Sequence, residues 1–465
     1  MKRREALRLV PISIAGMAGM AGTVFGKEMC GQCDYSGHTG SLAHQYSLKV
    51  RERLNWIRKN QSHNLMEAAY RIAQTVENGG QCYQYAWDAG HSEADSWPDR
   101  NGEPEIFNTQ MIVEKTKKGD LVIASGQLTS AKQLKDKGVI IIGRPSPWSG
   151  DARYPELLRD DIQEMKLKPF ADLWIETQAT SLGGVVNVPG MPAPFGPVSG
   201  IVGKTTIWMM LADACRILAR RGISVPVKGD EPKVSGDNTD YQNFSGWVNL
   251  HDPLMDNFFD EVMNQLELIF ADFGKIRKIA TMAVDSVLNG GTIYGYSLQN
   301  SVYGEASTRR SGLSMTQGVK GADPNTKENF KGTDKDFVIM GITKPDDKTD
   351  LEFLDLFRKR GMKVASIGPM TRSAKVPQGR TVPKETDIHA GRMCDTYGLF
   401  AVPGFNQRIC PTSGIVLDHL YWTTIMEVVE QYIQKTGGDV PGVYLSGALK
   451  GGMEHLYRMR ELYLK

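Results

Sequence analysis

The chain repeats itself, and this repeat constrains the fold more than any other feature of its 465 residues. The segment ENGGQCYQYA at 77–86 aligns with LNGGTIYGYS at 288–297. The segment PVSGIV at 197–202 aligns with PTSGIV at 411–416, and a Val-Pro-Gly tripeptide precedes each copy at the same spacing. Offsets of 211 and 214 residues across such a distance indicate two related units in tandem.

Both units show the same order of predicted elements. A long amphipathic helix comes first, with apolar residues at helical spacing from Leu48 to Val76 and from Phe258 to Val287, and each helix stops at Asn-Gly-Gly. Short apolar strands follow, at 81–85, 121–124 and 139–142 in unit one and at 292–296, 337–340 and 363–367 in unit two. Buried strands between helices predict an α/β class with parallel sheets covered by helices on both faces. The polar stretch 307–335 is interpreted as a long loop inside unit two.

The chain divides into four predicted segments. Residues 1–27 form an export signal, 44–230 the first unit, 231–252 a linker and 253–465 the second unit. In the signal, Arg3 and Arg4 precede Leu7 and an apolar stretch from Val10 to Phe25, which is typical of a twin-arginine signal. An ordinary secretory signal or an uncleaved anchor is the alternative. We therefore expect a periplasmic or otherwise extracytoplasmic protein.

Composition excludes several classes of function. Hydrophobic residues make up 41% and charged residues 23% of the chain, and the formal net charge is +2. That balance gives no pull toward nucleic acid. After the first 30 residues no apolar run reaches the ~20 residues that a membrane span needs, so no stable membrane insertion is expected once the signal is removed. The motifs predict no cofactor and no metal site.

Several segments resemble the SIS (sugar isomerase) domain family. The motif DAGHSE at 88–93 follows the first strand of unit one and is similar to the first phosphosugar-binding loop of SIS domains. The segment 172–201, its copy 387–415 and the C-terminal run 440–455 resemble the family as well. The resemblance implies two tandem flavodoxin-like three-layer αβα domains that pack as a pseudo-dimer. Family members isomerise, cleave or bind aldose and ketose phosphosugars.

Candidate ligand-binding residues lie in the loops of unit one. In an open parallel sheet, ligands bind beyond the carboxyl ends of the strands, and small hydroxyls with helix N-termini suit an anionic or polyhydroxyl ligand. The expected substrate-binding residues are Gly90, His91, Ser92, Ser125, Gly126, Thr129, Ser130 and Ser199. Family members usually carry Ser-Asn-Ser-Gly in the second loop, whereas this chain has ASGQ at 124–127. In the equivalent loop of unit two, Asp346 and Asp347 would repel phosphate, so that unit is expected to bind no phosphosugar by itself.

Candidate catalytic residues come from two parts of the chain. The resemblance implies a Glu base on the helix after the first loop, for which Glu93 is the candidate and Glu305 its counterpart in unit two. His455 with Glu454 would serve as ring-opening acid or base if the C-terminal segment reaches over unit one, giving a composite site. The alternatives are a Glu placed at a helix N-terminus by the dipole, and a Glu454–His455 pair facing solvent.

One motif is rejected as a nucleotide site. The run GIVGKTT at 200–206 is similar to a P-loop but lacks the first glycine, so Lys204 is expected on a helix face.

Two functions follow from the sequence. The chain is either an exported aldose–ketose sugar isomerase or a non-catalytic sugar or sugar-acid binding protein on the same scaffold. A purely structural pseudo-dimer with both clefts filled is the third possibility. The expected partner is a small-molecule sugar or sugar derivative, and homo-oligomerisation is left open.

Overall fold

The fold is described from a computed structural model. The structure describes residues 40–86, 102–108, 111–126, 128–146, 148, 150–229, 248–298, 301–307, 311–323, 325–369, 378–391 and 398–463.

Unit one contains a five-stranded parallel sheet. Its strands are β1 (Cys82–Ala86), β3 (Phe107–Asn108), β4 (Leu121–Ser125), β5 (Ile140–Arg144) and β6 (Leu173–Trp174). Their spatial order is β3-β1-β4-β5-β6, and every neighbouring pair runs parallel. This is the 2-1-3-4-5 order of flavodoxin-like folds, whose switch point lies between the first and third strands, here β1 and β4.

Unit two repeats this sheet. Its strands are β10 (Ile293–Ser297), β11 (Thr316–Lys320), β12 (Phe337–Gly341), β13 (Lys363–Ile367) and β14 (Ile388–Ala390). The order β11-β10-β12-β13-β14 is again 2-1-3-4-5 and wholly parallel, with the switch point between β10 and β12. Two antiparallel pairs complete the described strands, β2 (Glu103–Pro104) with β9 (Val227–Lys228) and β7 (Gly184–Val186) with β8 (Phe195–Pro197).

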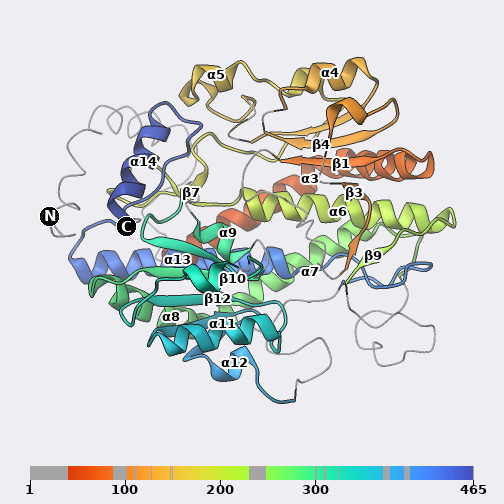
Figure 1. Cartoon of the computed structure of the whole chain (residues 1–465). Helices are drawn as coiled ribbons and strands as arrows, with labels where there is room; N and C mark the ends of the chain where they lie inside the picture. The colour runs from red at the N-terminus through yellow and green to blue at the C-terminus, as the bar shows by residue number, and fades with distance from the viewer. Residues whose placement is uncertain are drawn as a thin grey trace.

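Helices cover both faces of each sheet (Figure 1). Between the sheets lie α3 (Leu42–Glu77), α6 (Ser199–Arg220), α7 (Leu254–Leu268), α8 (Phe273–Leu288) and α13 (Ser413–Thr436). The other described helices are α4 (Ala131–Asp136), α5 (Asp160–Gln163), α9 (Val302–Ala306), α10 (Thr326–Asn329), α11 (Lys348–Lys359), α12 (Val382–Glu385) and α14 (Gly452–Tyr463). In Figure 1, α4 and α5 lie above the unit-one sheet and α11 and α12 below the unit-two sheet. The predicted α/β class and the two tandem three-layer units are therefore confirmed.

The helical layer is shared between the units. In unit one α3 packs on α6, and in unit two α8 packs on α13. Across the units α3 packs on α13 and α7 packs on α6, so each unit's first helical segment also contacts the other unit's last long helix. One continuous hydrophobic core contains residues from all of these helices. This reciprocal exchange is the pseudo-dimer that the resemblance implied.

The repeated sequence positions have the same backbone conformation in both units. Gly79 and Gly290, at the C-terminal ends of α3 and α8, have φ of 70° and 85°, and a left-handed glycine there is the usual helix C-cap. Gly196 and Cys410, which precede the repeated prolines, have φ of 79° and 64°. The sequence repeat is therefore a structural repeat, even where glycine in one unit is replaced by cysteine in the other.

A buried ion pair joins the units at equivalent positions of the repeat. Lys204 of α6 and Asp418 of α13 are 214 residues apart in sequence, and the Lys204 Nζ lies 2.8 Å from the Asp418 Oδ2. Their side chains are 3% and 1% exposed. The hydroxyl of Ser301 donates to the other carboxylate oxygen at 2.8 Å. Equivalent residues touch only near a two-fold axis, so the pseudo-two-fold axis passes beside this pair, and Lys204 is a core residue instead of a residue on an outer helix face.

Three expectations about local structure are wrong. The stretch 307–335 is not wholly a loop, because it contains β11, a polar edge strand beside α9. The helix expected from Phe258 to Val287 is divided by a 3-10 turn at Ile269–Asp272, where the Asp272 Oδ2 accepts from the Gly391 N–H at 3.1 Å. Leu48 lies outside the buried stripe and is 46% exposed.

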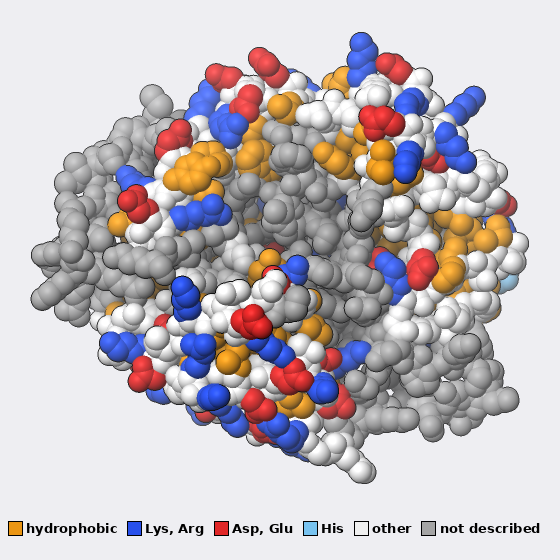
Figure 2. Space-filling view, viewed as in Figure 1, with side chains coloured by type: hydrophobic (Ala, Val, Ile, Leu, Met, Phe, Trp, Pro, Cys, Tyr) orange, Lys and Arg blue, Asp and Glu red, His pale blue; other side chains and the backbone are white. Residues whose placement is uncertain are grey.

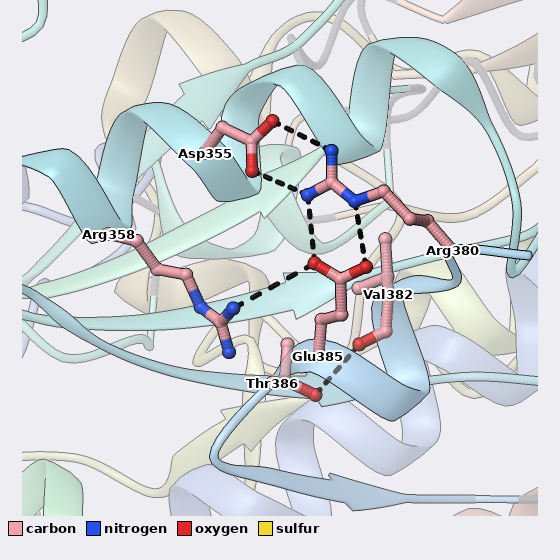
Figure 3. A network of polar contacts seen from close by, with 6 residues as sticks. All are labelled: Asp355, Arg358, Arg380, Val382, Glu385 and Thr386. Atoms are coloured by element: carbon pink, nitrogen blue, oxygen red, sulfur yellow. Dashed lines mark hydrogen bonds and ion pairs between the residues drawn. The ribbon is translucent and has the colours of Figure 1, made fainter.

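An exposed cluster of charges holds α12 against α11 (Figure 3). The Arg380 guanidinium donates to both oxygens of Asp355, at 3.1 and 2.6 Å, and to both oxygens of Glu385, each at 2.8 Å. Arg358 adds a contact of 3.8 Å to Glu385. Arg380 holds the pKa values of both carboxyl groups below their usual range. Figure 2 shows cationic and anionic side chains intermixed over both units on this face.

Candidate functional site

The carboxyl edge of the unit-one sheet brings together residues from several loops. Ser125 is the last residue of β4, next to the switch point, and is buried. Gly126 follows with φ of 101°, a conformation that favours glycine, and turns the chain out of the strand. In the ladder Ser125 pairs with Arg144, the last residue of β5. The predicted residues Ser125 and Gly126 therefore occupy the position where ligands of this fold class bind.

Arg144 connects this edge to α6. Its Nη1 donates to the Gly203 carbonyl at 3.3 Å and to the Thr206 hydroxyl at 3.0 Å. The side chain is buried, and burial lowers its pKa to about 9. Ser199, the first residue of α6, is half-buried one turn before Gly203. The start of α6 with Ser199 therefore lies at the same end of the unit-one sheet as Ser125.

The second loop ends at α4. Thr129 is exposed, and Ser130 is the half-buried N-cap residue of α4. No side-chain hydrogen bond caps this helix. Its first backbone bonds run from the Ala131 N–H to the Leu128 carbonyl and from the Leu134 N–H to the Ser130 carbonyl, both 2.9 Å.

The equivalent loop of unit two is capped by a carboxylate. Asp347 is the N-cap residue of α11, and its Oδ1 accepts from the N–H groups of Thr349 and Asp350 at 2.9 and 3.2 Å. A carboxylate at a helix N-terminus takes the place that an anionic ligand would otherwise occupy. Asp347 therefore has a structural role in addition to the repulsion of phosphate that the sequence predicted.

Replacement of the N-cap residue by alanine should destabilise the protein more at α11 than at α4. Asp347→Ala should lower the free energy of unfolding by about 1 kcal/mol, because two backbone N–H groups of α11 lose their acceptor. Ser130→Ala is the matched control and should have a smaller effect, since no side-chain bond is lost from α4. Urea denaturation of the two variants measures both values, and equal losses would contradict this assignment.

The short helix α9 of unit two is tied into the helical layer. Glu305 is buried, and its Oε2 accepts from the Trp422 Nε1 at 2.7 Å. Ser301, just before α9, donates to Asp418. The hydroxyl of Ser297, at the end of β10, accepts from the Tyr303 N–H at 2.9 Å. The counterpart of Glu93 in unit two thus holds α9 against α13.

The C-terminal segment does reach from unit two to unit one. The Ala448 carbonyl accepts from the Arg159 N–H at 2.9 Å, and the Leu157 carbonyl accepts from the Lys450 N–H at 3.0 Å. In α14, Glu454 is exposed, whereas His455 is buried with its Nε2 2.8 Å from the Val443 carbonyl. Burial lowers the pKa of His455. The structure therefore separates the environments of these two predicted catalytic residues and places the imidazole against its own segment.

Four predicted site residues lie outside the described residues. They are Glu93, Gly90, His91 and Ser92. Their assignment as base and first-loop residues stays a prediction.

The aspartates that begin the repeated segments 172–201 and 387–415 lie at the amino edge of the sheets, opposite the candidate site. The Oδ2 of Asp172 accepts from the Ile141 N–H, and the Oδ2 of Asp387 accepts from the Val364 N–H, both at 2.8 Å. Ile141 and Val364 lie near the amino ends of β5 and β13. These repeated aspartates stabilise strand ends and do not face the carboxyl edge.

Sequence reasoning missed a pair of arginines near the carboxyl end of β6. Arg53, on α3, is half-buried, and Arg153 is exposed. Charge interactions couple Arg53 to Arg153 and to Glu176, and burial with the Arg153 charge lowers the Arg53 pKa to about 10. The sequence pattern could have identified Arg53, because it has helical spacing with the buried residues Val50 and Ile57.

Membrane and metal sites were sought in the described part of the chain. None of its helices has the length and apolar character of a membrane span. It also holds no group of three or more His, Cys, Asp or Glu residues arranged to bind a metal ion.

Comparison with known proteins finds distant likenesses. No protein-family model matches the chain. A UPF0309 protein of Geobacillus thermodenitrificans is 22% identical over 214 residues, covering 39% of this chain and 86% of that protein. The C-terminal domain of glucosamine-fructose-6-phosphate aminotransferase from Francisella tularensis is 10% identical, with a TM-score of 0.45 over 88% of this chain and 99% of that one. Glucosamine-6-phosphate deaminase from Thermotoga maritima is 11% identical, with a TM-score of 0.39 over 88% and 98%. At these values the likeness extends neither to activity nor to ligand.

Proposed function

We propose that this protein binds a sugar derivative at the carboxyl edge of the unit-one sheet, with unit two as its structural partner. The observation that carries the proposal is the difference between the two units at equivalent loops. In unit one Ser125 ends β4 beside the switch point, and Ser130 begins α4 without a side-chain cap bond. In unit two the carboxylate of Asp347 occupies the start of α11, and Glu305 is bonded to α13. A carboxylate caps α11 in unit two, whereas no side-chain hydrogen bond caps α4 in unit one, and this difference suits a single binding site in unit one.

The ligand class follows from the chemistry of this edge and from the SIS resemblance. A polyhydroxyl ligand needs several short donors and acceptors around a mostly buried floor. Ser125 lies on such a floor, with Thr129, Ser130 and Ser199 at the same end of the sheet. The proposal includes the predicted export signal, so that the ligand is bound outside the cytoplasm, and cell fractionation of the full chain tests this part.

Binding without catalysis is the better supported role. An isomerase needs a carboxylate base and an acid that protonates the ring oxygen. Of the candidates, His455 uses its Nε2 on the Val443 carbonyl and Glu454 is exposed. Sugar isomerase activity rests on Glu93 alone, and loss of aldose–ketose exchange in Glu93→Gln, followed by NMR in D2O, would establish it over the binding role.

Replacing Ser125 should abolish ligand binding. A sugar derivative at 100 times its dissociation constant stabilises the wild type by ~2.7 kcal/mol, which a thermal-shift screen of sugars, sugar acids and sugar phosphates detects. We expect Ser125→Ala to lose that shift, because the hydroxyl at the switch point is removed. The matched control is Ser297→Ala, which removes a buried strand-end hydroxyl in unit two and should retain the shift. A shift retained in Ser125→Ala but lost in Ser297→Ala, or no shift with any sugar, would contradict the proposal.

A further inference from the structure

The arginines of α3 differ in how their charges are balanced. Arg51 lies 3.5 Å from the Glu267 carboxylate, and the Arg58 Nε lies 3.3 Å from that of Asp256. Arg71 pairs with Glu67 within the helix at 2.7 Å. Arg53 has no carboxylate oxygen within 4 Å among the residues that the structure describes. It is therefore the exception on a helix whose other described arginines are all paired.

Arg53 is half-buried beside the buried stripe of α3. The buried stripe of α3 contains Tyr46, Val50 and Ile57, and Arg53 falls at the same helical spacing between the last two. An arginine at such a position is normally satisfied by a carboxylate or by a bound anion, because an unpaired charge away from bulk water is costly. The nearby Arg153 charge raises that cost.

The surrounding loops fix Arg153 and Glu176 at the carboxyl edge of the sheet. The Arg153 carbonyl accepts from the N–H and hydroxyl of Ser181 at 3.1 and 2.7 Å. The Glu176 N–H donates to Gln61 of α3 at 3.0 Å, just beyond the end of β6. Thr177, next in the chain, donates to the Pro145 carbonyl, which directly follows β5. Arg153 and Glu176 therefore lie beyond β5 and β6, at the same edge as Ser125.

Strained backbone gathers around these residues. Three of the four non-glycine residues with positive φ in the described part of the chain are Tyr154, Gln178 and Ser311, at 65°, 56° and 61°. Ser181 donates to the Tyr154 carbonyl, and Ser311 donates to the Leu182 carbonyl, so the three segments adjoin. Left-handed non-glycine residues persist where the surrounding structure holds them in place, often at binding sites.

We propose that Arg53 and Arg153 form an oxyanion-binding site beyond the carboxyl ends of β5 and β6, with Arg53 at its floor, Arg153 at its rim and Glu176 beside them. Two guanidinium groups and one carboxylate give the site a net positive charge, and planar forks of N–H donors suit the oxygens of a carboxylate or a phosphate. The anion is either a free oxyanion or the charged group of the sugar derivative proposed above. In the second case the inference rests on the proposed function.

The test is thermal denaturation of the full chain with sulfate, inorganic phosphate, gluconate, glucose 6-phosphate or glucose, each at ionic strength matched with sodium chloride. We expect the oxyanions to raise the melting temperature of the wild type above the chloride value. Arg53→Gln and Arg153→Gln should each weaken the anion effect at least about tenfold in apparent dissociation constant, since each removes charge-assisted hydrogen bonds. Arg220→Gln, which removes an exposed arginine from α6, is the matched control and should retain it.

The melting temperature without added anion separates a binding role of Arg53 from a structural one. Without added anion, Arg53→Gln should melt no lower than the wild type, because it relieves the repulsion with Arg153. A lower melting temperature with an intact anion effect would overturn the proposal, as would a wild-type response no larger than that to chloride.

Ser125→Ala identifies the source of the anion. Loss of the gluconate or glucose 6-phosphate response in both Arg53→Gln and Ser125→Ala supports a charged sugar derivative that spans the two positions. A phosphate or sulfate response that survives in Ser125→Ala and disappears in Arg53→Gln supports a separate oxyanion site. If Arg53→Gln retains every response while Ser125→Ala loses the response to glucose, the oxyanion site fails and the proposed function stands.

Discussion

Lys204→Met should lower the free energy of unfolding by about 3–5 kcal/mol, since it leaves the Asp418 carboxylate buried without its cation. The side chain of Asp418 is 1% exposed, so water cannot replace the ammonium group. The hydroxyl of Ser301 remains, but neutral donors compensate a buried charge only in part. Guanidinium chloride denaturation, followed by the fluorescence of the buried Trp208 and Trp422, measures the loss.

The double variant Lys204→Met/Asp418→Leu separates the effect of the ion pair from the effect of side-chain packing at this position. Replacing both charges by apolar side chains removes the desolvation cost of both, and such replacements are often neutral or stabilising. We therefore expect the double variant to recover most of the stability that the single variant loses. The surface variant Arg380→Ala is the control for removal of a cation from an exposed carboxylate pair (Figure 3). A Lys204→Met loss no larger than that of Arg380→Ala would show that the buried pair is not needed.

The position of this pair explains why the two units belong on one chain. Lys204 and Asp418 are equivalent residues of the repeat and meet at the pseudo-two-fold axis. A dimer of identical units would place either two lysines or two aspartates there, and like charges in a buried site repel strongly. Opposite charges at this point require two different units, which the duplicated chain provides.

Much of the fold could be predicted because its signals are local. Gly79 and Gly290 mark helix ends through a backbone conformation that glycine adopts without strain. The strands expected at 121–124, 337–340 and 363–367 lie within one residue of the observed bounds, and the strand expected at 139–142 lies within two, because buried parallel strands are short apolar runs between turn signals.

The errors arise where tertiary contacts override a local pattern. The sequence of β11 is TQGVK, which lacks the apolar run of a central strand. It forms a strand because it pairs with β10, a contact that its own composition does not predict. The burial of Lys204 depends on a helix more than 200 residues away in sequence. For the candidate site, the hydroxyls of the second loop were predicted from the resemblance, whereas the Arg53–Arg153 site needs segments that only the fold brings together.

The buried histidines His389 and His419 should make the protein lose stability in mild acid. Burial lowers their pKa values to about 4 and about 3, from about 6.5 in an unfolded chain. As the pH falls below 6.5 the unfolded state takes up protons that the folded state does not, so the free energy of unfolding decreases until the folded pKa values are reached. Between pH 7.5 and 5.0 each histidine should contribute a loss of about 2 kcal/mol.

The surroundings of the two rings support these directions. His389 lies 2.8 Å from the Ser366 hydroxyl and 3.0 Å from the Gly391 carbonyl, with the charges of Asp272 and Lys275 nearby and of opposite effect. His419 is fully buried, its Nδ1 is 3.4 Å from the Thr423 hydroxyl, and the Arg51 charge further disfavours its protonation. Both sites therefore hold a neutral imidazole.

The quantity to compare between variants is the slope of the free energy of unfolding against pH, because groups other than the two histidines also titrate. The buried carboxyl of Asp350 has a pKa well above its usual value, mainly through burial, and so stabilises the fold as the pH falls. The variant His389→Gln/His419→Gln retains that contribution and removes both imidazoles. Its free energy of unfolding should fall about 4 kcal/mol less than that of the wild type between pH 7.5 and 5.0. The control His63→Gln, which removes an exposed histidine of α3, should keep the wild-type slope. An unchanged slope in the double variant would contradict the prediction, because it would mean that the two rings are protonated in the folded protein as readily as in the unfolded chain.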